Sequence, residues 1–250
     1  MLELVCIACI CVAILVFFHN QATYEYKINQ ILWTQRESLP SLMAERGPLV
    51  VKGLPPVAFW TQQDCMMREC YSHVPVFQDK GLSEWLMSAD PDTACPWSKE
   101  HAGLLGGLSG LGLWTETHID PVVRTNPLWT AWYQPKVSCW AGSRGLWKGG
   151  ARWTVLFVTE GAIQVSIMAG THEKGLPVGW KTKAVHPSKL TVYDTPFAAD
   201  LKYLDIVLRP GHCLIMPPHW LMSWLRLEGS ETLPMVCAIE YHTPISSVLR

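Results

Sequence analysis

The sequence predicts a mainly β domain of the sandwich, jelly-roll or barrel kind, with a few helices at its N-terminal side and one transmembrane helix ahead of it. From Trp114 onwards, short apolar or alternating runs follow one another between Gly and Pro residues, without a strong helical pattern among them. At the other end, the run from Leu2 to Phe18 is apolar at every position except Glu3. We therefore divide the chain into an anchor at residues 1–20, a helical linker at 21–44 and a β-rich domain at 45–250.

The apolar run has the length of a short membrane span. Residues 2–18, at about 1.5 Å each, would form a helix of about 25 Å, the low end of what crosses a bilayer. No Lys or Arg precedes the run and residues 19–22 form a poor cleavage site, so an uncleaved anchor is favoured over a signal peptide. A buried core element is the alternative. We expect a single-pass N-terminal membrane anchor, whose compartment and face the flanking charges leave open.

Composition excludes some classes of partner. Charged residues form 16% of the chain and the formal net charge is -1, which leaves no electrostatic footprint for nucleic acid. The cysteines beyond residue 20 include no CxxC pair, so a zinc site is disfavoured and a disulfide framework cannot be argued. We expect contact with a membrane through residues 2–18 and a protein or small-molecule substrate of unknown identity.

Between the anchor and Trp114, helices and short strands are expected in alternation. They are an amphipathic helix at Thr23–Arg36, strands at Leu49–Val51 and Val74–Phe77, a helix at Phe59–Cys70 capped by Thr61, and a short helix from Ser83. The stretch Gly103–Gly112 holds five glycines and is expected to be too flexible for a helix. It is either an ordinary glycine loop or backbone that closely approaches a site.

The C-terminal part is expected to be built from strands joined by Gly- and Pro-containing turns, with Glu160-Gly161 joining two of them as a hairpin. The expected strands are Trp129–Tyr133, Lys136–Trp140, Trp153–Val158, Ala162–Met168, Lys189–Tyr193, Leu204–Leu208, Cys213–Met216, Met222–Leu227 and Met235–Tyr241.

The triplet His118-Ile119-Asp120 is the first candidate for chemistry. In an extended segment, side chains at i and i+2 point the same way, so His118 and Asp120 could present an imidazole and a carboxylate to one point. Two His and one carboxylate on one side of the metal are typical of non-haem Fe(II) oxygenases. The pattern alone is weak, because the two residue types meet by chance in many chains.

Four blocks in order resemble the cupin-like, Jumonji-C-related hydroxylases. They are Glu45–Leu54, similar to the family's opening strand; Leu82–Leu86, similar to a helix that follows; the block from His118-Ile119-Asp120-Pro121 through Asn126 and Lys136 to Trp140; and Leu208–Trp220, similar to the family's closing motif. The resemblance extends over roughly Glu45 to His242. It implies a double-stranded β-helix, which is a jelly roll, with Fe(II) and 2-oxoglutarate in its mouth.

Several residue roles follow from this resemblance alone. His118 and Asp120 would ligate the metal, Lys136 would hold the far carboxylate of 2-oxoglutarate, and Asn126 would help to position it. Lys136 reads equally well as a solvated position at a strand edge. Asn126 reads equally well as a turn residue before Pro127. Catalytic residues beyond these binding roles stay unknown.

The chain departs from the family pattern at the third metal ligand. Where the family has its second histidine, two residues after the Trp of the closing motif, this chain has Met222. A thioether is a soft, neutral ligand that cannot replace imidazole on Fe(II) without a large loss of affinity. His219 lies three residues earlier, and this odd offset places it on the opposite face if the strand has already begun. His219 would complete the site only from an irregular turn.

Two functions from different classes stay open at this point. The first is a membrane-anchored Fe(II)/2-oxoglutarate-dependent dioxygenase that hydroxylates a protein or small molecule, with His118, Asp120 and His219 as metal ligands and Lys136 and Asn126 at the co-substrate. The second is a catalytically inactive jelly roll that serves as a binding or structural module. The loss of a ligand at Met222 favours the second, and the retained triplet favours the first.

Overall fold

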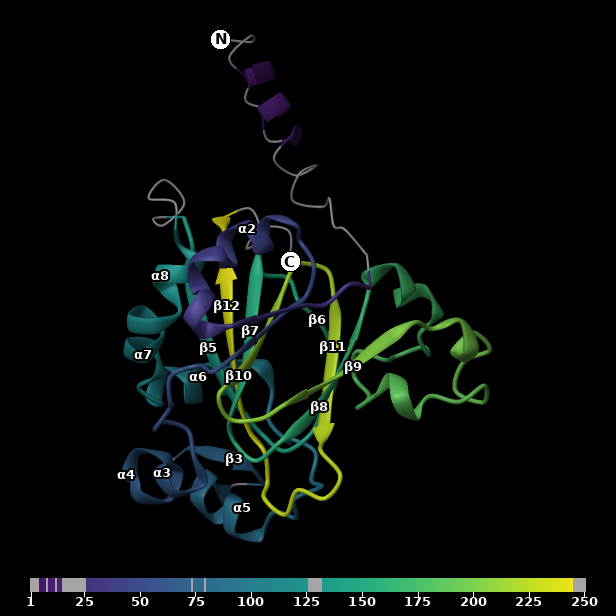
Figure 1. The fold of residues 1–250 in the computed structure, drawn as a ribbon. Coiled ribbons are helices and arrows are strands. Elements are labelled where there is room, and N and C mark those ends of the chain that lie inside the picture. Colours follow the sequence, from purple (N-terminus) through teal and green to yellow (C-terminus); the bar gives the residue numbers. More distant parts are fainter. Residues whose placement is uncertain are drawn as a thin grey trace.

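The computed structural model of the chain describes residues 5–7, 9–11, 13–14, 26–72, 74–78, 80–125 and 132–244. Two sheets dominate it (Figure 1). The larger has the order β1 (Asn29–Leu32), β2 (Leu49–Lys52), β10 (His212–Met216), β7 (Trp153–Glu160), β12 (Met235–His242), β5 (Gln134–Ala141). The smaller has the order β6 (Arg144–Lys148), β11 (Leu221–Arg226), β8 (Ile163–Met168), β9 (Tyr203–Leu208). Strand β1 runs parallel to β2, and all other neighbours in these two sheets are antiparallel.

Helices make up much of the remaining described chain, so the fold contains both helices and sheets. They are η1 (Trp33–Ser38), α2 (Leu39–Ala44), α3 (Gln62–Met67), α4 (Glu69–Ser72), α5 (Leu82–Ser88), α6 (Lys99–Leu108), α7 (Leu111–His118) and α8 (Asp120–Val123), with a small hairpin of β3 (Pro75–Phe77) and β4 (Lys80–Gly81) between α4 and α5. Each large sheet ends in two edge strands, β1 and β5 in one and β6 and β9 in the other, so neither closes as a barrel. The predicted mainly β, double-stranded β-helix is therefore wrong.

The region from Lys99 to Val123 accounts for much of this difference. Its glycines predicted a loop, and its His-x-Asp triplet was expected to be extended, yet it forms α6, α7 and α8. Ser98 caps α6, because its Oγ accepts a hydrogen bond from the backbone N–H of His101. Gly106 lets α6 lie flush on the edge of β5, since a Cβ at this position would collide with the carbonyl of Val137. The helix thus covers an otherwise open sheet edge.

The N-terminal predictions also need correction. Among the described residues, no helix has both the length and the apolar character needed to cross a bilayer. Within the predicted span, residues 5–7, 9–11 and 13–14 are helical, and the remaining positions of 2–18 lie outside the described residues. This finding contradicts the predicted single-pass anchor. In the part of the predicted linker 21–44 that the structure describes, residues 26–44, helix begins at Trp33, because Asn29–Leu32 forms a strand beside β2.

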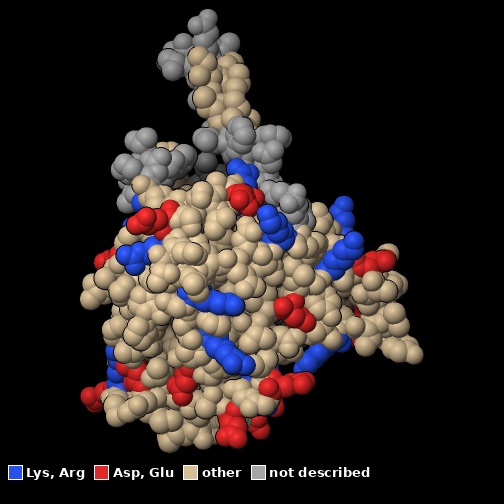
Figure 2. Space-filling view, viewed as in Figure 1, with Lys and Arg blue, Asp and Glu red and all other residues tan. Residues whose placement is uncertain are grey.

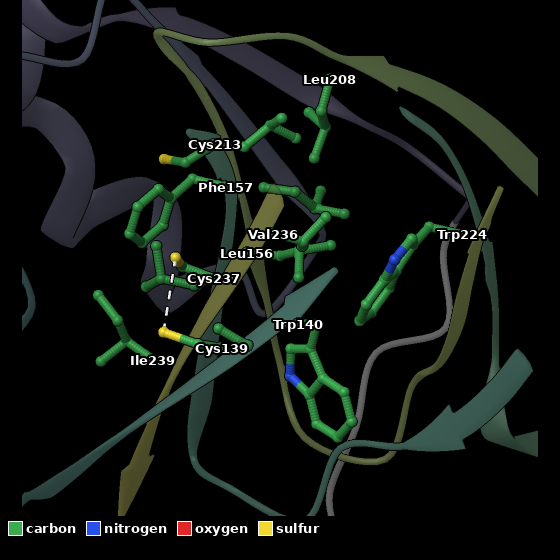
Figure 3. Packing of buried hydrophobic residues seen from close by; sticks show 14 of the residues in the cluster. Cys139, Trp140, Leu156, Phe157, Leu208, Cys213, Trp224, Val236, Cys237 and Ile239 are labelled. Atoms are coloured by element: carbon green, nitrogen blue, oxygen red, sulfur yellow. Dashed lines mark hydrogen bonds between the residues drawn. The ribbon is translucent and has the colours of Figure 1, made fainter. Parts of the chain in front are cut away.

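The larger sheet packs on helices with one face and on the smaller sheet with the other. Cys139 and Phe157 pair with the same residue of β12, so they share a face. The ring of Phe157 lies 5.3 Å from that of Trp114 in α7, which marks this face as the helix side. Trp140, next to Cys139, points the other way, and its ring lies 6.3 Å from that of Trp224 in β11 (Figure 3). Trp140 and Trp224 therefore fill the space between the two sheets.

An insertion between β8 and β9, residues 169–202, forms a lobe at the side of the smaller sheet (Figure 1). It contains the short helices η2 (Gly170–Gly175), η3 (Pro187–Lys189) and η4 (Ala198–Asp200). A second apolar cluster, which includes Trp180 of the lobe and Leu221 of β11, ties it to the sheet. The strand predicted at Lys189–Tyr193 is absent from this described segment, which is turns and a 3-10 helix.

Candidate functional site

The structure places the predicted metal ligands His118 and Asp120 on helices rather than on an extended strand. His118 is the last residue of α7 and Asp120 the first of α8. Ile119 between them has helical backbone angles, φ -90° and ψ -43°. In a helical backbone, residues i and i+2 point about 200° apart around the axis, so the two side chains do not converge on one point. The geometric basis for the His-x-Asp prediction is therefore wrong.

The carboxylate of Asp120 already has two strong partners. Its Oδ1 accepts a hydrogen bond of 2.6 Å from the hydroxyl of Tyr241 in β12, and its Oδ2 lies 3.0 Å from Nη1 of Arg124. Burial, and then the hydrogen bond to Asp120, raise the pKa of the Tyr241 hydroxyl, so it stays a donor. The contacts of Asp120 join α8 to the helix side of the larger sheet.

Met222, the position where the family has a histidine, lies on the other side of that sheet. Tyr241 and Glu240 are successive residues of β12 and point to opposite faces. Glu240 pairs in register with Thr154 of β7, so the two share the face turned to the smaller sheet. A Cβ at Gly149 would lie 3.5 Å from Thr154 Oγ1 and 3.9 Å from Met222 Cε. The larger sheet therefore separates Met222 from Asp120.

The surroundings of Met222 contain apolar and neutral groups. Met222 is fully buried on β11 and pairs in register with Trp147 of β6. In the described part of the chain, no group of three or more His, Cys, Asp and Glu side chains is placed to hold a metal ion. The residues do not fit the Fe(II) that the family resemblance implies.

The remaining predicted site residues are dispersed. His219 lies in the turn before β11 with a left-handed backbone, φ 69°, and its N–H donates to the carbonyl of Gly149. Asn126 lies outside the described residues. Lys136 is exposed on β5, where it pairs in register with Glu240. Lys136 lines a pocket that we call the edge pocket.

The edge pocket lies where α6 crosses the edge of β5, and its volume is about 230 Å³. Its lining comes from α6, β5 and β12: Lys99, Glu100, Gly103, Lys136, Val137, Ser138 and Glu240.

Glu240 is the most deeply buried charge at this pocket, at 2% exposed. Its Oε1 lies 2.7 Å from Nζ of Lys99, and its Oε2 lies 3.4 Å from Nε2 of His242, which is equally buried. Burial alone would raise the pKa of the Glu240 carboxyl, but the hydrogen bond to His242 and the charge of Lys99 lower it to about 2. The carboxylate is therefore ionised across the physiological range.

Arg144, at the start of β6, lies against three tryptophan rings, those of Trp140, Trp147 and Trp224, which we call the aromatic cage. Its guanidinium lies 3.2 Å from the ring centre of Trp140, 5.1 Å from that of Trp147 and 5.9 Å from that of Trp224. The ring of Trp147 also contacts the ammonium of Lys99, at 5.0 Å. Burial lowers the pKa of Arg144 to about 10, so the group stays cationic at neutral pH. Both cations therefore lie against aromatic faces, and Lys99 is held by its ion pair with Glu240 as well.

The buried thiols are packing groups rather than nucleophiles. Cys139 and Cys237 face each other across β5 and β12 with their sulfurs 4.0 Å apart (Figure 3). Burial raises the pKa of the Cys237 thiol, and burial raises that of Cys213 to about 12. Such thiols hold little thiolate at neutral pH, so they lack the form that attacks or binds metals.

Sequence reasoning missed Lys99, Arg144, Glu240 and His242. Lys99 and Glu240 are 141 residues apart, so their ion pair has no local signal. One signal was present nonetheless, since Glu240 is the single charged residue in the apolar run Met235–Tyr241. A carboxylate inside a buried strand requires a hydrogen-bonding or charged partner. A single acidic residue in an apolar run therefore predicts such a partner elsewhere in the chain.

Comparisons with known proteins add little to this geometry. No protein-family model matches the chain, and neither does any curated protein. Among solved structures, it is similar to one described as "X-Ray structure of E. coli ycfD", with 14% identity and a TM-score of 0.32. The match covers 51% of this chain and 30% of that one. A similarity at this level carries no argument about fold or function.

Proposed function

We propose that this protein is a catalytically inactive binding module, not an Fe(II)/2-oxoglutarate-dependent hydroxylase. One observation carries the proposal: the His118-Ile119-Asp120 triplet and Met222 lie on opposite sides of the larger sheet. An iron site of the oxygenase kind needs its ligands on one face of a single metal ion, with the opposite positions open. A sheet between two of the ligand positions is incompatible with that geometry.

The contacts of Asp120 support the same proposal. Both oxygens of Asp120 are engaged by Tyr241 and Arg124, and these contacts hold the carboxylate on the helix side of the larger sheet. In the described part of the chain, the further ligands that an iron site needs are not grouped around it. Asp120 instead stabilises the contact between α8 and the sheet.

The binding role is supported by the edge pocket. Ligand sites in proteins are concave, with a few polar groups that converge, and the edge pocket has this form with charged residues from three elements. The Lys99–Glu240 ion pair fixes one wall of it. The hydroxyl of Ser138 in this lining donates to the backbone carbonyl of Ala238, so it serves the strand pairing rather than acting as a nucleophile.

The test measures iron and turnover in the full chain. The protein is prepared without oxygen, mixed with Fe(II) and 2-oxoglutarate, and assayed for bound iron and for succinate after oxygen is admitted. We expect neither above the level of a buffer blank. Iron bound in stoichiometric amount, together with succinate that disappears in His118→Ala, would refute the proposal.

The variant Met222→His tests whether a histidine at this position can restore an iron site. If the site were a hydroxylase that had lost one ligand, this variant would recover iron binding. We expect no recovery, because a histidine at this position would face Trp147 and Gly149 instead of His118 and Asp120. Met222→Leu is the matched control, since it keeps an apolar side chain of similar volume. Iron bound by Met222→His but not by Met222→Leu would overturn the placement of the two segments.

A further inference from the structure

We propose that α3 and α5 form a docking surface for a basic amphipathic helix of a partner protein. The surface is built around three exposed methionines, Met66 and Met67 of α3 and Met87 of α5, which we call the methionine patch. The inference rests on the proposed function, since a binding module needs a partner, and it names the chemistry of that partner. The patch is separate from the edge pocket, to whose lining neither helix contributes.

The three methionines leave much of their apolar surface in solvent. Met66 is 47% exposed, Met67 74% and Met87 70%. Single apolar side chains on a surface are ordinary, whereas several on neighbouring elements are typical of an interaction site. Methionine suits such a site, because its unbranched and polarizable side chain adapts to the shape of a partner.

A hydrogen bond between the two helices places the methionines close together. The hydroxyl of Ser83 in α5 donates to the backbone carbonyl of Cys65 in α3, at 3.1 Å. Met66 follows Cys65 directly, and Met87 lies one turn after Ser83 on the same side of α5. Met66 and Met87 therefore lie on the two sides of the contact between α3 and α5.

The lengths of the two helices fit a short stretch of a partner helix. α3 has six residues and α5 has seven, so each is about 10 Å long at a rise of about 1.5 Å per residue. An amphipathic helix presents apolar side chains at i, i+3, i+4 and i+7, which span about the same length. Two turns of such a helix would therefore cover the patch.

The charge around the patch selects a basic partner. Residues 61–92, which include α3 and α5, contain six acidic residues and two basic ones, whereas the whole chain has a formal net charge of -1. Arg68, next to Met67, is paired with Asp64 at 2.7 Å. Within the described chain, the exposed carboxylate of Glu84 in α5 forms no ion pair. Figure 2 shows acidic side chains gathered at the lower end of the molecule, where Figure 1 places α3 to α5.

The same negative charge disfavours other classes of partner. Membrane surfaces and nucleic acids are themselves negatively charged, so they attract lysine and arginine rather than carboxylates. A basic amphipathic helix supplies an apolar stripe for the methionines and flanking lysines or arginines for the carboxylates. Attraction between the opposite charges speeds the encounter, and burial of the methionine side chains stabilises the complex.

The experiment measures binding of a designed helix to the full chain by fluorescence anisotropy. The probe is a fluorescein-labelled peptide of leucine and lysine with leucines at i, i+3, i+4 and i+7, about 14 residues long so that a helix can form. One control peptide has the same composition with its leucines spread around the helix, and the other has glutamate in place of lysine. We expect saturable binding of the probe, which weakens as sodium chloride is raised, and much weaker binding of both controls.

Matched variants locate the binding on the patch. Met67→Gln and Met87→Gln should each weaken binding about tenfold, because each removes an apolar side chain that the peptide would bury. Val178→Gln is the control, since it makes a similar change of polarity at a residue of the lobe that is 96% exposed. Glu84→Gln should weaken binding about threefold and reduce its dependence on salt, whereas Asp200→Asn in the lobe should change neither.

Three results would overturn the proposal. They are no saturable binding of the probe, equal affinity for the probe and the peptide with spread leucines, and equal effects of Met67→Gln and Val178→Gln. A second copy of the chain would be the alternative occupant of the patch. Sedimentation that shows a dimer of the unliganded protein, lost in Met67→Gln, would assign the patch to self-association and likewise overturn the proposal. Far-ultraviolet circular dichroism checks that every variant folds.

The outcome is independent of the iron assay. The titration contains no metal, so iron-dependent turnover would refute the proposed function without changing the affinity for the probe. Conversely, failure of the probe to bind would remove this docking surface and leave the inactive-module proposal to its own test.

Discussion

Replacing Glu240 by Gln tests the most consequential interaction at the edge pocket. The substitution keeps the shape of the side chain and removes its charge, so the 2.7 Å ion pair with Lys99 is lost in the protein interior. Lys99 keeps about a third of its side chain in solvent, at 35% exposed, so its ammonium can be rehydrated after the change. The free energy of unfolding should therefore fall by an amount toward the low end of the roughly 3–5 kcal/mol seen when one partner of a buried ion pair is removed.

The pKa of Glu240 gives a magnitude by a separate route. The pKa of this carboxyl is about 2 in the folded chain, against 4.5 for an unperturbed glutamate. Each pKa unit corresponds to about 1.36 kcal/mol, so ionisation of Glu240 stabilises the folded state by about 3 kcal/mol at pH 7. The two routes agree, and we expect Glu240→Gln to lower the free energy of unfolding by about 3 kcal/mol.

The pH dependence of this stabilisation follows from the direction in which the pKa of Glu240 is shifted. Because the folded pKa is lower than the unfolded one, the stabilisation is present above pH 4.5 and is lost as the pH falls towards about 2. The difference between wild type and Glu240→Gln should therefore shrink, to about 1.4 kcal/mol at pH 3. Other carboxylates titrate in this range too, but they are common to both proteins and cancel in the difference.

Urea unfolding followed by tryptophan fluorescence provides the assay, at pH 7 and at steps down to pH 3. Lys99→Met and the double variant complete a thermodynamic cycle, which isolates the coupling between Lys99 and Glu240. A loss below about 0.5 kcal/mol at pH 7, within the range of ordinary surface substitutions, would refute the reasoning. A difference that stays constant from pH 7 to pH 3 would refute the assignment of the effect to charge.

Three further substitutions test the packing of the helices on the larger sheet. Gly106→Ala should destabilise the protein by about 1–3 kcal/mol, because its Cβ would collide with Val137, whereas Gly107→Ala, in open space on the same helix, should stabilise it by about 0.5–1 kcal/mol. Equal effects of the two in urea unfolding would contradict the close approach of α6 to β5. Tyr241→Phe should lower the unfolding free energy by about 1.5–3 kcal/mol through loss of its hydrogen bond to Asp120, and an unchanged midpoint would show that this contact contributes nothing.

The sequence predicted well those strands whose pattern is local. Trp153–Val158, Cys213–Met216 and Met235–Tyr241 correspond to β7, β10 and β12, with ends that differ by at most two residues. The cap at Thr61 is confirmed as well, since its Oγ1 accepts a hydrogen bond from the N–H of Asp64. Apolar runs between turn residues and a polar cap before a helix act over a few positions, so the chain alone specifies them.

The glycine-rich stretch shows where local pattern failed. Five glycines between Gly103 and Gly112 argue against a helix, because each costs about 1 kcal/mol relative to alanine in a helix interior. The packing of α6 on the edge of β5 overrides that preference, and Gly106 is what permits the approach. Helix propensity carries no information about the strand edge, which lies some thirty residues further along the chain.

By itself the sequence determined the alternating strands, the apolar interior and the absence of a histidine at Met222. Only the tertiary structure decided that His118 and Asp120 are helical, that a sheet separates them from Met222, and that Lys99 meets Glu240. The physical reason is range: side-chain alternation and caps are set by neighbouring residues, whereas the face on which a residue lies, and its partner there, depend on how distant segments pack.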